Sequence, residues 1–506
     1  MTDSLNVTPL DAHNKTLLGN VRPADWQNPE PASSYNLVVI GGGTAGLMTA
    51  AGAAGLGAKV ALVERHLMGG DCLNAGCVPS KSILRSARLQ AEILAAGDFG
   101  IRLASAPEVD FGKVMERMRA IRARISVNDS ATRFRDLGVD VFLGKAEFIT
   151  SHKVNVSGKI LNFKKAVIAT GGRAAVPPVE GLQEAAYLTN ETLFNLTLMP
   201  KRFGILGAGP IGCEMAQAFA RFGSQVTLVD MAPQVLIRED PDAAKILQQQ
   251  LEREGVRLVL NAKLLKVEKR PDGKVVHYEI AGENKSLVFD ELLVSVGRAP
   301  NVEHMGLEAA GVQYDKRTGV KVNEHLQTTN PRIYACGDVA FKYQFTHTAE
   351  ATAKIVIQNA LFFGKKKAKD LIIPWCTYTD PEIAHVGIDE KEAKERKINL
   401  AIFRQPLAEV DRAITDGEEN GFVKIMLRQG TDQILGATIV AKHAGEILSE
   451  ITLAMNSGIG LAAIANVIHP YPTQADAIKR TAYQYNRTRL KPWVKALLTR
   501  FFTLRR

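Results

Sequence analysis

The stretch GGGTAGLMTAAGAAGLGAKVALVE, residues 41–64, occurs a second time in altered form as GAGPIGCEMAQAFARFGSQVTLVD, residues 207–230. Each copy follows a short apolar run, residues 37–40 and 203–206, and each ends on a carboxylate. Each copy therefore predicts a strand, a glycine-rich turn, a helix and a second strand. The repeat predicts two similar α/β units within one chain.

The glycine spacing in each copy matches the G-x-G-x-x-G fingerprint of dinucleotide-binding turns. The first glycine permits a tight turn, the second lets the backbone approach a pyrophosphate, and the third lets helix and strand pack closely. The helix N-terminus then faces the phosphates, and a carboxylate after the second strand can accept ribose hydroxyls. One such motif is weak evidence, but two in register with matched acids are strong. The predicted binding residues are Gly41, Gly43, Gly46 and Glu64 in the first copy and Gly207, Gly209, Gly212 and Asp230 in the second.

Two of the five cysteines, Cys72 and Cys77, lie close together in the segment GGDCLNAGCVPSK, residues 69–81. Cysteines at this spacing in an ideal helix have Cα atoms about 8 Å apart, whereas a disulfide needs less than about 7 Å. A bridge therefore requires a turn or a distorted helix, which Gly76 permits. The alternative is a zinc site, but no second Cys or His pair lies at zinc-finger spacing. We predict a redox pair and no metal site.

Length and composition predict a globular chain of about three domains, with 506 residues and a hydrophobic fraction of 46%. The net charge is +10, but no nucleic-acid motif accompanies it, so we predict no nucleic-acid partner. Residues 37–58 are uncharged and long enough to span a bilayer. Because they are crowded with glycine and match the fingerprint, we interpret them as nucleotide-binding. No secretory signal is visible in residues 1–15, which favours a cytoplasmic location.

The cysteine segment resembles the active-site disulfide of the pyridine nucleotide-disulfide oxidoreductases, which include glutathione reductase, dihydrolipoamide dehydrogenase and mercuric reductase. The resemblance runs from about Tyr35 to about Lys479 and includes the motifs ATG (169–171), GRAPN (297–301) and CGDV (336–339). It implies an α/β fold with two Rossmann-like dinucleotide-binding domains, for FAD and NAD(P), and an α+β C-terminal dimerisation domain. The expected parts are an N-terminal extension (1–34), the FAD domain (35–180 and 302–370), the NAD(P) domain (181–301), the dimerisation domain (371–488) and a basic amphipathic tail (489–506).

The resemblance also implies roles for individual residues. Cys77 would be the charge-transfer thiolate nearer the flavin, and Cys72 the interchange thiol that attacks substrate. Lys81 and Glu214 match an ion pair beside the flavin N5; the alternative is that Glu214 is simply a polar helix residue. Further cofactor contacts are expected from Lys81, Thr170, Gly171, Gly297, Arg298 and Asp338.

The sequence departs from the family in HPYPTQAD, residues 469–476. Tyr471 stands where the disulfide reductases have a catalytic His, and Asp476 where they have its Glu partner. A phenol with a pKa near 10 is a poor base, and His469 is the alternative base. Mercuric reductase also carries this Tyr, but the chain has no cysteine after Cys376 to deliver Hg(II). We predict a mercuric-reductase-like enzyme with an unidentified acceptor; the alternatives are a dihydrolipoamide dehydrogenase or the flavoprotein component of a membrane-associated redox system.

The remaining expectations concern the coenzyme and the partners. Asp230 would repel a 2′-phosphate, and the next two positions supply no Arg, so NADH is favoured over NADPH, although Arg238 lies eight residues beyond. The family implies a homodimer. The tail KPWVKALLTRFFTLRR, residues 491–506, has a broad apolar face, which predicts a helix lying on a membrane surface. Packing of the tail on its own dimer, or disorder, are the alternatives.

Overall fold

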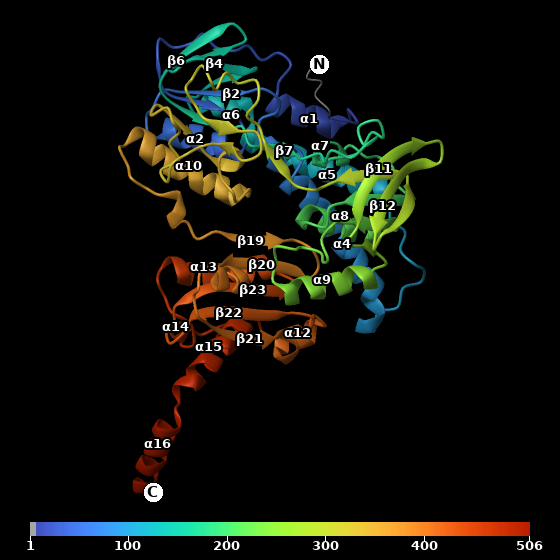
Figure 1. The fold of residues 1–506 in the computed structure, drawn as a ribbon, viewed down its shortest axis with the longest axis vertical. Coiled ribbons are helices and arrows are strands. Elements are labelled where there is room, and N and C mark those ends of the chain that lie inside the picture. The colour runs from blue at the N-terminus through green and yellow to red at the C-terminus, as the bar shows by residue number, and fades with distance from the viewer. Residues whose placement is uncertain (1–6) are drawn as a thin grey trace. The chain divides into compact units, whose positions relative to one another are not determined.

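The computed structural model describes residues 7–506, which form two compact units (Figure 1). Unit 1 covers the described residues to Pro233 together with Glu254–Leu371, and unit 2 covers Gln234–Arg253 together with Ile372–Arg506. None of the helices in the described residues is both long and apolar enough to cross a membrane. The expected boundary between an FAD and an NAD(P) domain stays a prediction.

The first parallel sheet of unit 1 contains the first copy of the repeat. Its strands run in the order β3 (Asp140–Leu143), β2 (Val60–Glu64), β1 (Tyr35–Ile40) and β6 (Lys159–Ile168), all parallel, and β18 (Ile333–Ala335) also pairs with β6. The sheet continues through antiparallel β5 (Lys153–Val156) and β4 (Ala146–Thr150). Strands β1 and β2 are nearly continuous apolar runs because both faces are covered. Helices α2 (Thr44–Gly55) and α10 (Thr346–Leu361) pack together beside this sheet.

The second parallel sheet repeats this order with β10 (Arg257–Val259), β9 (Gln225–Val229), β8 (Arg202–Leu206) and β14 (Glu291–Val294). Helix α8 (Pro210–Phe222) follows β8 as α2 follows β1, so the sequence repeat is a structural repeat. Strand β14 ends at Val294, and the chain has a φ of 135° at Gly297, where the GRAPN motif begins. Two small sheets complete this part: β11 (Lys263–Arg270), β12 (Gly273–Ile280) and β13 (Glu283–Phe289), and the pair β15 (Arg298–Pro300) and β7 (Gly172–Ala174).

The described part of the N-terminal extension, residues 7–34, belongs to unit 1. Helix α1 (Ala12–Val21) packs against α5 (Phe111–Ser126) and buries Leu17 and Val21 completely. The side chain of Asp11 accepts a hydrogen bond from the Asn14 N–H at 2.9 Å and caps the helix.

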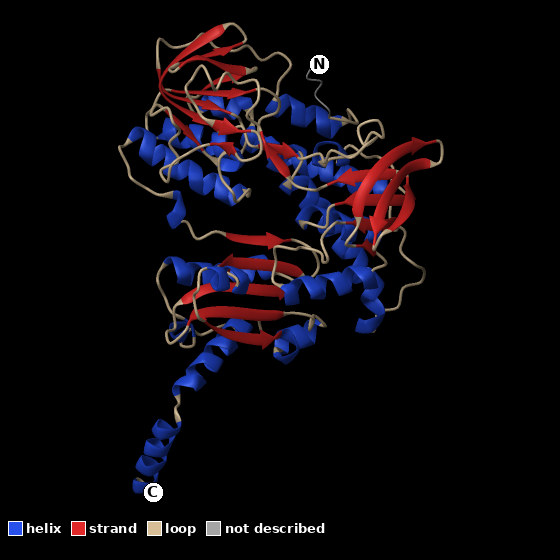
Figure 2. Ribbon diagram, in the orientation of Figure 1, coloured by secondary structure: helices blue, strands red, loops and turns tan. Residues whose placement is uncertain are grey.

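Unit 2 contains a five-stranded antiparallel sheet (Figure 2). Its order is β19 (Pro374–Thr377), β20 (Glu382–Gly387), β23 (Ile434–Ala441), β22 (Phe422–Arg428) and β21 (Leu400–Pro406). Helices α13 (Ala444–Asn456) and α15 (Asp476–Arg489) share one apolar core with it. A sheet with helices packed against it is the α+β arrangement expected for residues 371–488. The tail forms helix α16 (Pro492–Leu504).

The remaining helices are α6 (Ala131–Asp136), α7 (Asn190–Leu193), α9 (Pro241–Arg253), α11 (Glu390–Glu395), α12 (Asp411–Asp416) and α14 (Leu461–Ile464). The remaining strands are β16 (Tyr314–Asp315) and β17 (Gly319–Val320).

Candidate active site

The first nucleotide-binding turn can be built only from glycines. Gly41 has φ 110°, and a Cβ there would lie 2.3 Å from the Ala169 carbonyl oxygen. A Cβ on Gly46 would lie 1.7 Å from the Gly41 oxygen. Gly43 is the N-cap of α2 and leaves the helix N–H groups without a side-chain partner. The free N–H groups and the helix dipole fit the pyrophosphate of a dinucleotide.

The second turn has the same backbone geometry. Gly207 has φ 107°, a Cβ on Gly212 would lie 1.9 Å from the Gly207 oxygen, and Gly209 is the N-cap of α8. The two glycine motifs with the predicted spacing therefore form turns with the same backbone geometry.

The two carboxylates that close the repeats lie at the turns, as the sequence predicts. Glu64 accepts the N–H groups of Gly42 and His66, both at 2.6 Å. Asp230 likewise accepts those of Ala208 at 2.5 Å and Ala232 at 2.7 Å. Each carboxylate is thus oriented by its own turn. Acceptance of ribose hydroxyls stays a prediction.

The ATG and GRAPN motifs lie side by side in unit 1. The Thr170 hydroxyl donates to the Asn301 carbonyl oxygen at 2.7 Å, and the Asn301 side-chain amide donates back to the Thr170 oxygen at 3.0 Å. The Asn301 N–H donates to the oxygen of Gly171, which has φ 66°. These contacts place the predicted cofactor residues of the two motifs in one region.

Arg298 joins the GRAPN motif to the cysteine segment. Its guanidinium, with 18% of the side chain exposed, forms ion pairs with Asp71 and with Asp338, the latter at 3.4 Å. Burial raises the pKa of Asp338, and Arg298 opposes that rise. Arg298 and Asp338 are among the predicted site residues, whereas no motif position marks Asp71.

The cysteine segment breaks where the spacing requires. Helix α3 (Gly70–Asn74) ends before Gly76, and α4 (Cys77–Leu94) begins at the second cysteine. A Cβ on Gly76 would lie 2.8 Å from the Asp71 carbonyl oxygen, so the turn needs glycine. Both cysteines are free thiols in this structure.

The two thiols are electrostatically unequal. A hydrogen bond from Cys72 lowers the pKa of Cys77 to about 6, although burial opposes the shift. The same hydrogen bond raises the pKa of Cys72. The pair therefore ionises first at Cys77.

Lys81 on α4 and Glu214 on α8 form the predicted ion pair, with Nζ 2.8 Å and 3.1 Å from the two carboxylate oxygens. The Glu214 side chain is 5% exposed and the Lys81 side chain 38%. A buried carboxylate with a cationic partner is not an incidental polar group on a helix surface. The positive charge of Lys81 also contributes to the low pKa of Cys77.

Thr346 is a site residue that the sequence analysis missed. Its hydroxyl oxygen lies 3.2 Å from the Cys77 sulfur, and it is the first residue of α10. No motif marks a threonine at a helix start, so only the structure could reveal the contact.

Tyr471 and Asp476 in unit 2 have different polar partners. The Tyr471 hydroxyl donates to Asp411 at 2.9 Å, which raises the pKa of Tyr471. Asp476 instead pairs with Arg480 at 2.7 Å, and Arg480 also contacts Asp411 at 3.1 Å. The reason is that Arg480, one helical turn after Asp476, neutralises that carboxylate.

His469 is poorly placed to act as the alternative base. Its Nε2 lies 3.0 Å from Glu450, and its Nδ1 lies 3.3 Å from the Val467 carbonyl oxygen. Both ring nitrogens therefore already face acceptor groups within unit 2. In the part of the chain described, no group of three or more His, Cys, Asp or Glu side chains could hold a metal ion.

Two dinucleotide-type turns beside a polarised cysteine pair define a nucleotide-dependent thiol oxidoreductase. The comparisons identify which class this is. The family pyridine nucleotide-disulphide oxidoreductase matches residues 35–353, and the dimerisation domain of the same family matches residues 373–482. The chain belongs to this family of FAD-dependent enzymes.

Individual relatives align with about nine-tenths of the chain. The mercuric reductase of Staphylococcus aureus is 33% identical over 90% of this chain and 83% of its own length. The dihydrolipoyl dehydrogenase of Thermus scotoductus is 34% identical over 89% of this chain and 97% of its own. Among solved structures, the HOCl-induced flavoprotein disulfide reductase RclA from Escherichia coli matches with a TM-score of 0.80 and 29% identity, over 89% of this chain and 99% of that chain.

The protein is therefore an oxidoreductase that uses FAD and a pyridine nucleotide, and its dimerisation domain supports a homodimer. The first turn and its neighbours fit FAD, because they offer uncapped helix N–H groups and side-chain-free backbone.

Proposed function

We propose that reducing equivalents pass from NADH through FAD to the Cys72–Cys77 pair and on to a small-molecule acceptor. The observation that supports it is the polarised thiol pair, with Cys77 favoured as the thiolate. Bound FAD supplies two-electron transfer between the nicotinamide and the disulfide. Lys81 provides positive charge beside Cys77, and Glu214 keeps Lys81 in place. Cys72 is the thiol that reacts with the acceptor.

The enzyme resembles mercuric reductase in its chemistry, and its acceptor is not an ordinary disulfide. Tyr471 donates to Asp411 and so cannot take a proton from an interchange thiol. Loss of a matched acid–base partner lowers turnover by roughly 10²–10⁴-fold. We expect slow turnover of glutathione disulfide and lipoamide, and reduction of Hg(II) only in excess thiol.

A panel of acceptors under anaerobic NADH tests this proposal. Hg(II), glutathione disulfide, lipoamide and quinones are compared in the unaltered protein and in Tyr471→His. We expect the histidine variant to gain disulfide turnover, with Tyr471→Phe as the matched control that gains none. Rapid lipoamide turnover by the unaltered protein would restore the alternative, a dihydrolipoamide dehydrogenase.

We propose further that activity requires the homodimer, because in the family residues 469–476 complete the site of the partner subunit. Light scattering under assay conditions tests this. A fully active monomer excludes a shared site.

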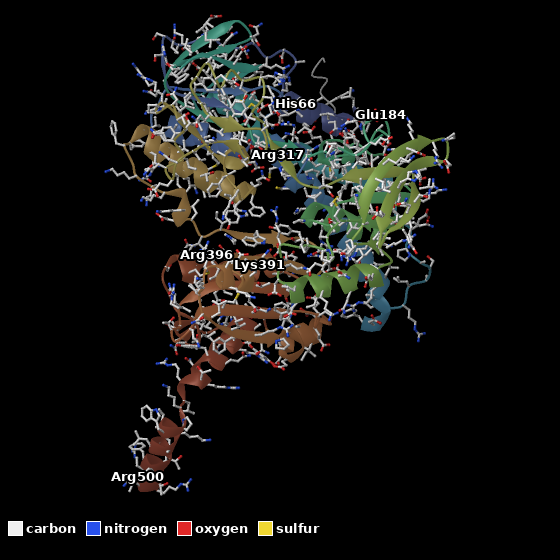
Figure 3. All side chains as sticks on the ribbon, in the orientation of Figure 1. His66, Glu184, Arg317, Lys391, Arg396 and Arg500 are labelled. Carbon is white, nitrogen blue, oxygen red and sulfur yellow. The ribbon has the colours of Figure 1, made fainter. Side chains whose placement is uncertain are left out.

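We also propose that the tail contacts an anionic membrane surface, so that a cytoplasmic enzyme associates peripherally with the bilayer. Helix α16 buries no residue, and Trp493 is 66% exposed, Leu497 61% and Phe501 46%. Residues 489–506 carry six basic side chains, of which Arg500 is marked in Figure 3, and no acidic one. Each could add about 1 kcal/mol near anionic lipid, and the apolar side chains suit the interface.

Vesicle co-sedimentation tests the tail. We expect the full chain to bind phosphatidylserine-containing vesicles at low salt, and a chain ending at Arg489 to remain in solution. The proposal is contradicted if the protein binds only to neutral vesicles, or if the full chain and the shortened chain bind equally. A change in oligomeric state on removing the tail indicates instead that α16 packs on its own dimer.

A further inference from the structure

The N-terminal extension lies outside the part of the chain that matches the family, which begins at residue 35. Its described residues, 7–34, nevertheless make buried contacts within unit 1. Leu17 and Val21 have no exposed surface, and Asp11 forms an ion pair with Arg119 of α5 at 2.5 Å. The extension is thus packed against α5, although the family match does not include it.

The extension holds the segment that leads from the first nucleotide turn to the cysteines. The Arg22 guanidinium donates to the carbonyl oxygens of Arg65 at 3.0 Å and His66 at 2.7 Å. Figure 3 marks His66. The Met68 N–H donates to the Val21 carbonyl oxygen at 3.2 Å. These contacts lie between Glu64, the carboxylate of the first turn, and Cys72.

A fourth contact reaches the residues between the two cysteines. The Arg122 guanidinium donates through Nη1 to the Asn74 carbonyl oxygen at 2.7 Å and through Nη2 to the Asn14 side-chain oxygen at 2.8 Å. Asn14 is completely buried, and its amide N–H donates to the Pro9 carbonyl oxygen at 2.8 Å. That second bond fixes which amide atom faces Arg122.

Arg122 needs both acceptors because it is buried. Its side chain is surrounded by protein, and burial lowers the pKa of Arg122 to about 10, which leaves the guanidinium charged at neutral pH. A buried charge is tolerated only where hydrogen bonds replace its hydration. Asn14 therefore decides whether Arg122 stays aimed at Asn74.

We propose that the N-terminal extension is a clamp that holds the backbone of residues 65–75 in a fixed position relative to the first nucleotide turn. Arg122 is the positioning residue, and Asn14 orients Arg122. The role of the clamp in thiol chemistry rests on the proposed redox function of Cys72 and Cys77. Closing and opening a disulfide moves the two sulfurs relative to each other, while the Asn74 carbonyl between them stays fixed. The clamp thus confines that movement to the cysteine side chains and Gly76.

The test compares substitutions along the same helix. Asn14→Leu removes the acceptor for Arg122, Asn14→Asp retains an acceptor oxygen, and Arg22→Met removes the contacts to Arg65 and His66. Asn20→Ala is the matched control, because Asn20 on α1 donates to Ser126 and not to the segment. Backbone hydrogen exchange is measured by mass spectrometry for peptides covering residues 65–77.

We expect exchange in this segment to rise about tenfold in Asn14→Leu and Arg22→Met, the size that one lost charge-assisted bond gives. Asn14→Asp and Asn20→Ala should match the unaltered protein, and peptides from β1 and β8 should be unchanged. Unchanged exchange at 65–77 in both disrupting variants overturns the clamp. A uniform rise across unit 1 does so as well, because it reports only lost stability.

A second measurement separates the clamp from the redox proposal. The rate at which iodoacetamide alkylates Cys77 in the reduced protein is followed against pH, and Asn14→Leu should shift the profile while Asn20→Ala does not. If NADH fails to reduce the cysteine pair, the proposed function fails, but a localised change in exchange still supports the clamp. If NADH reduces the pair normally and exchange is unchanged, the clamp alone fails.

Discussion

The two dinucleotide-binding halves of unit 1 share their strand order and turn geometry but differ in what covers the turn. In the first half, the Gly69 N–H donates to the Gly42 carbonyl oxygen at 2.8 Å, and a Cβ on Gly70 would lie 2.6 Å from the Gly43 Cα. In the second half, no described atom lies within 4 Å of a Cβ built on Gly209. The chain that carries the cysteines lies on the first turn, and the second turn is open.

This difference matches two kinds of ligand. A turn enclosed by its own chain suits a group that stays bound, and an open turn suits a coenzyme that exchanges at every turnover. The contact of the cysteine segment with the first turn also brings redox chemistry to the half expected to hold FAD. The two copies of the motif thus differ in the segment that follows the second strand.

The largest expected effect comes from the cysteines that only the first half acquired. Cys72→Ser should abolish turnover because no interchange thiol remains. The same variant should show a long-wavelength charge-transfer band without added reductant, because Cys77 can then no longer be held in a disulfide and is free to ionise beside Lys81. Cys77→Ser should have no band at any pH.

The second half supplies the matched control. Cys213 follows its third glycine, is fully buried and lies 3.3 Å from the Ala208 carbonyl oxygen. Cys213→Ala should retain turnover and the band. Absence of the band in Cys72→Ser would reverse the roles assigned to the two thiols.

A smaller effect is expected from adding one methyl group to each turn. Gly46→Ala and Gly212→Ala both force a Cβ against a carbonyl oxygen, at a cost of about 1–3 kcal/mol, which corresponds to roughly 10–100-fold weaker binding. Gly46→Ala should lose flavin during purification. Gly212→Ala should retain flavin and show a raised KM for NADH.

Flavin absorbance and circular dichroism are measured on both variants, so that misfolding is distinguished from lost binding. Loss of flavin from Gly212→Ala, with retention in Gly46→Ala, would exchange the assignments of the two halves.

The sequence predicted the repeat, both turns and the break at Gly76, because these depend on local glycine geometry that a spacing pattern records. It also predicted the Lys81–Glu214 pair through resemblance. It missed the contacts of Asp71, Asn14 and Thr346, which come from residues far apart in the chain with no motif. It did not identify Asp411, which accepts the hydrogen bond from the Tyr471 hydroxyl, because no motif position marks this residue.

The second half also predicts coenzyme choice. Asp230 lies at the open turn, where its charge would repel a 2′-phosphate. The unaltered protein should have the higher kcat/KM with NADH, and Asp230→Asn should reduce that preference by about tenfold, equivalent to 1.4 kcal/mol. Steady-state kinetics with both coenzymes measure the ratio. A higher kcat/KM with NADPH in the unaltered protein contradicts the prediction.

The smallest expected effect comes from the contact between Thr346 and Cys77. We predict no equivalent contact in the second dinucleotide-binding half. The Thr346 hydroxyl lies 3.2 Å from the Cys77 sulfur and lowers the pKa of Cys77, after the larger contribution of the Cys72 hydrogen bond. In Thr346→Val the thiolate loses one donor, worth about 0.5–1.5 kcal/mol, and one pKa unit corresponds to about 1.4 kcal/mol. The thiolate fraction grows as pH rises through about 6, so a raised pKa weakens the charge-transfer band most strongly near that pH.

A pH titration of the band in the reduced protein measures this shift. Thr346→Ser retains the hydroxyl and should titrate as the unaltered protein does. Thr348→Val is the control on the same helix, because the Thr348 hydroxyl is buried without a hydrogen-bond partner among the residues described. We expect the midpoint to rise by about half to one pH unit in Thr346→Val alone, as one neutral hydrogen bond predicts. A midpoint that is the same in all four proteins would show that Cys72 and Lys81 suffice to hold the charge on Cys77.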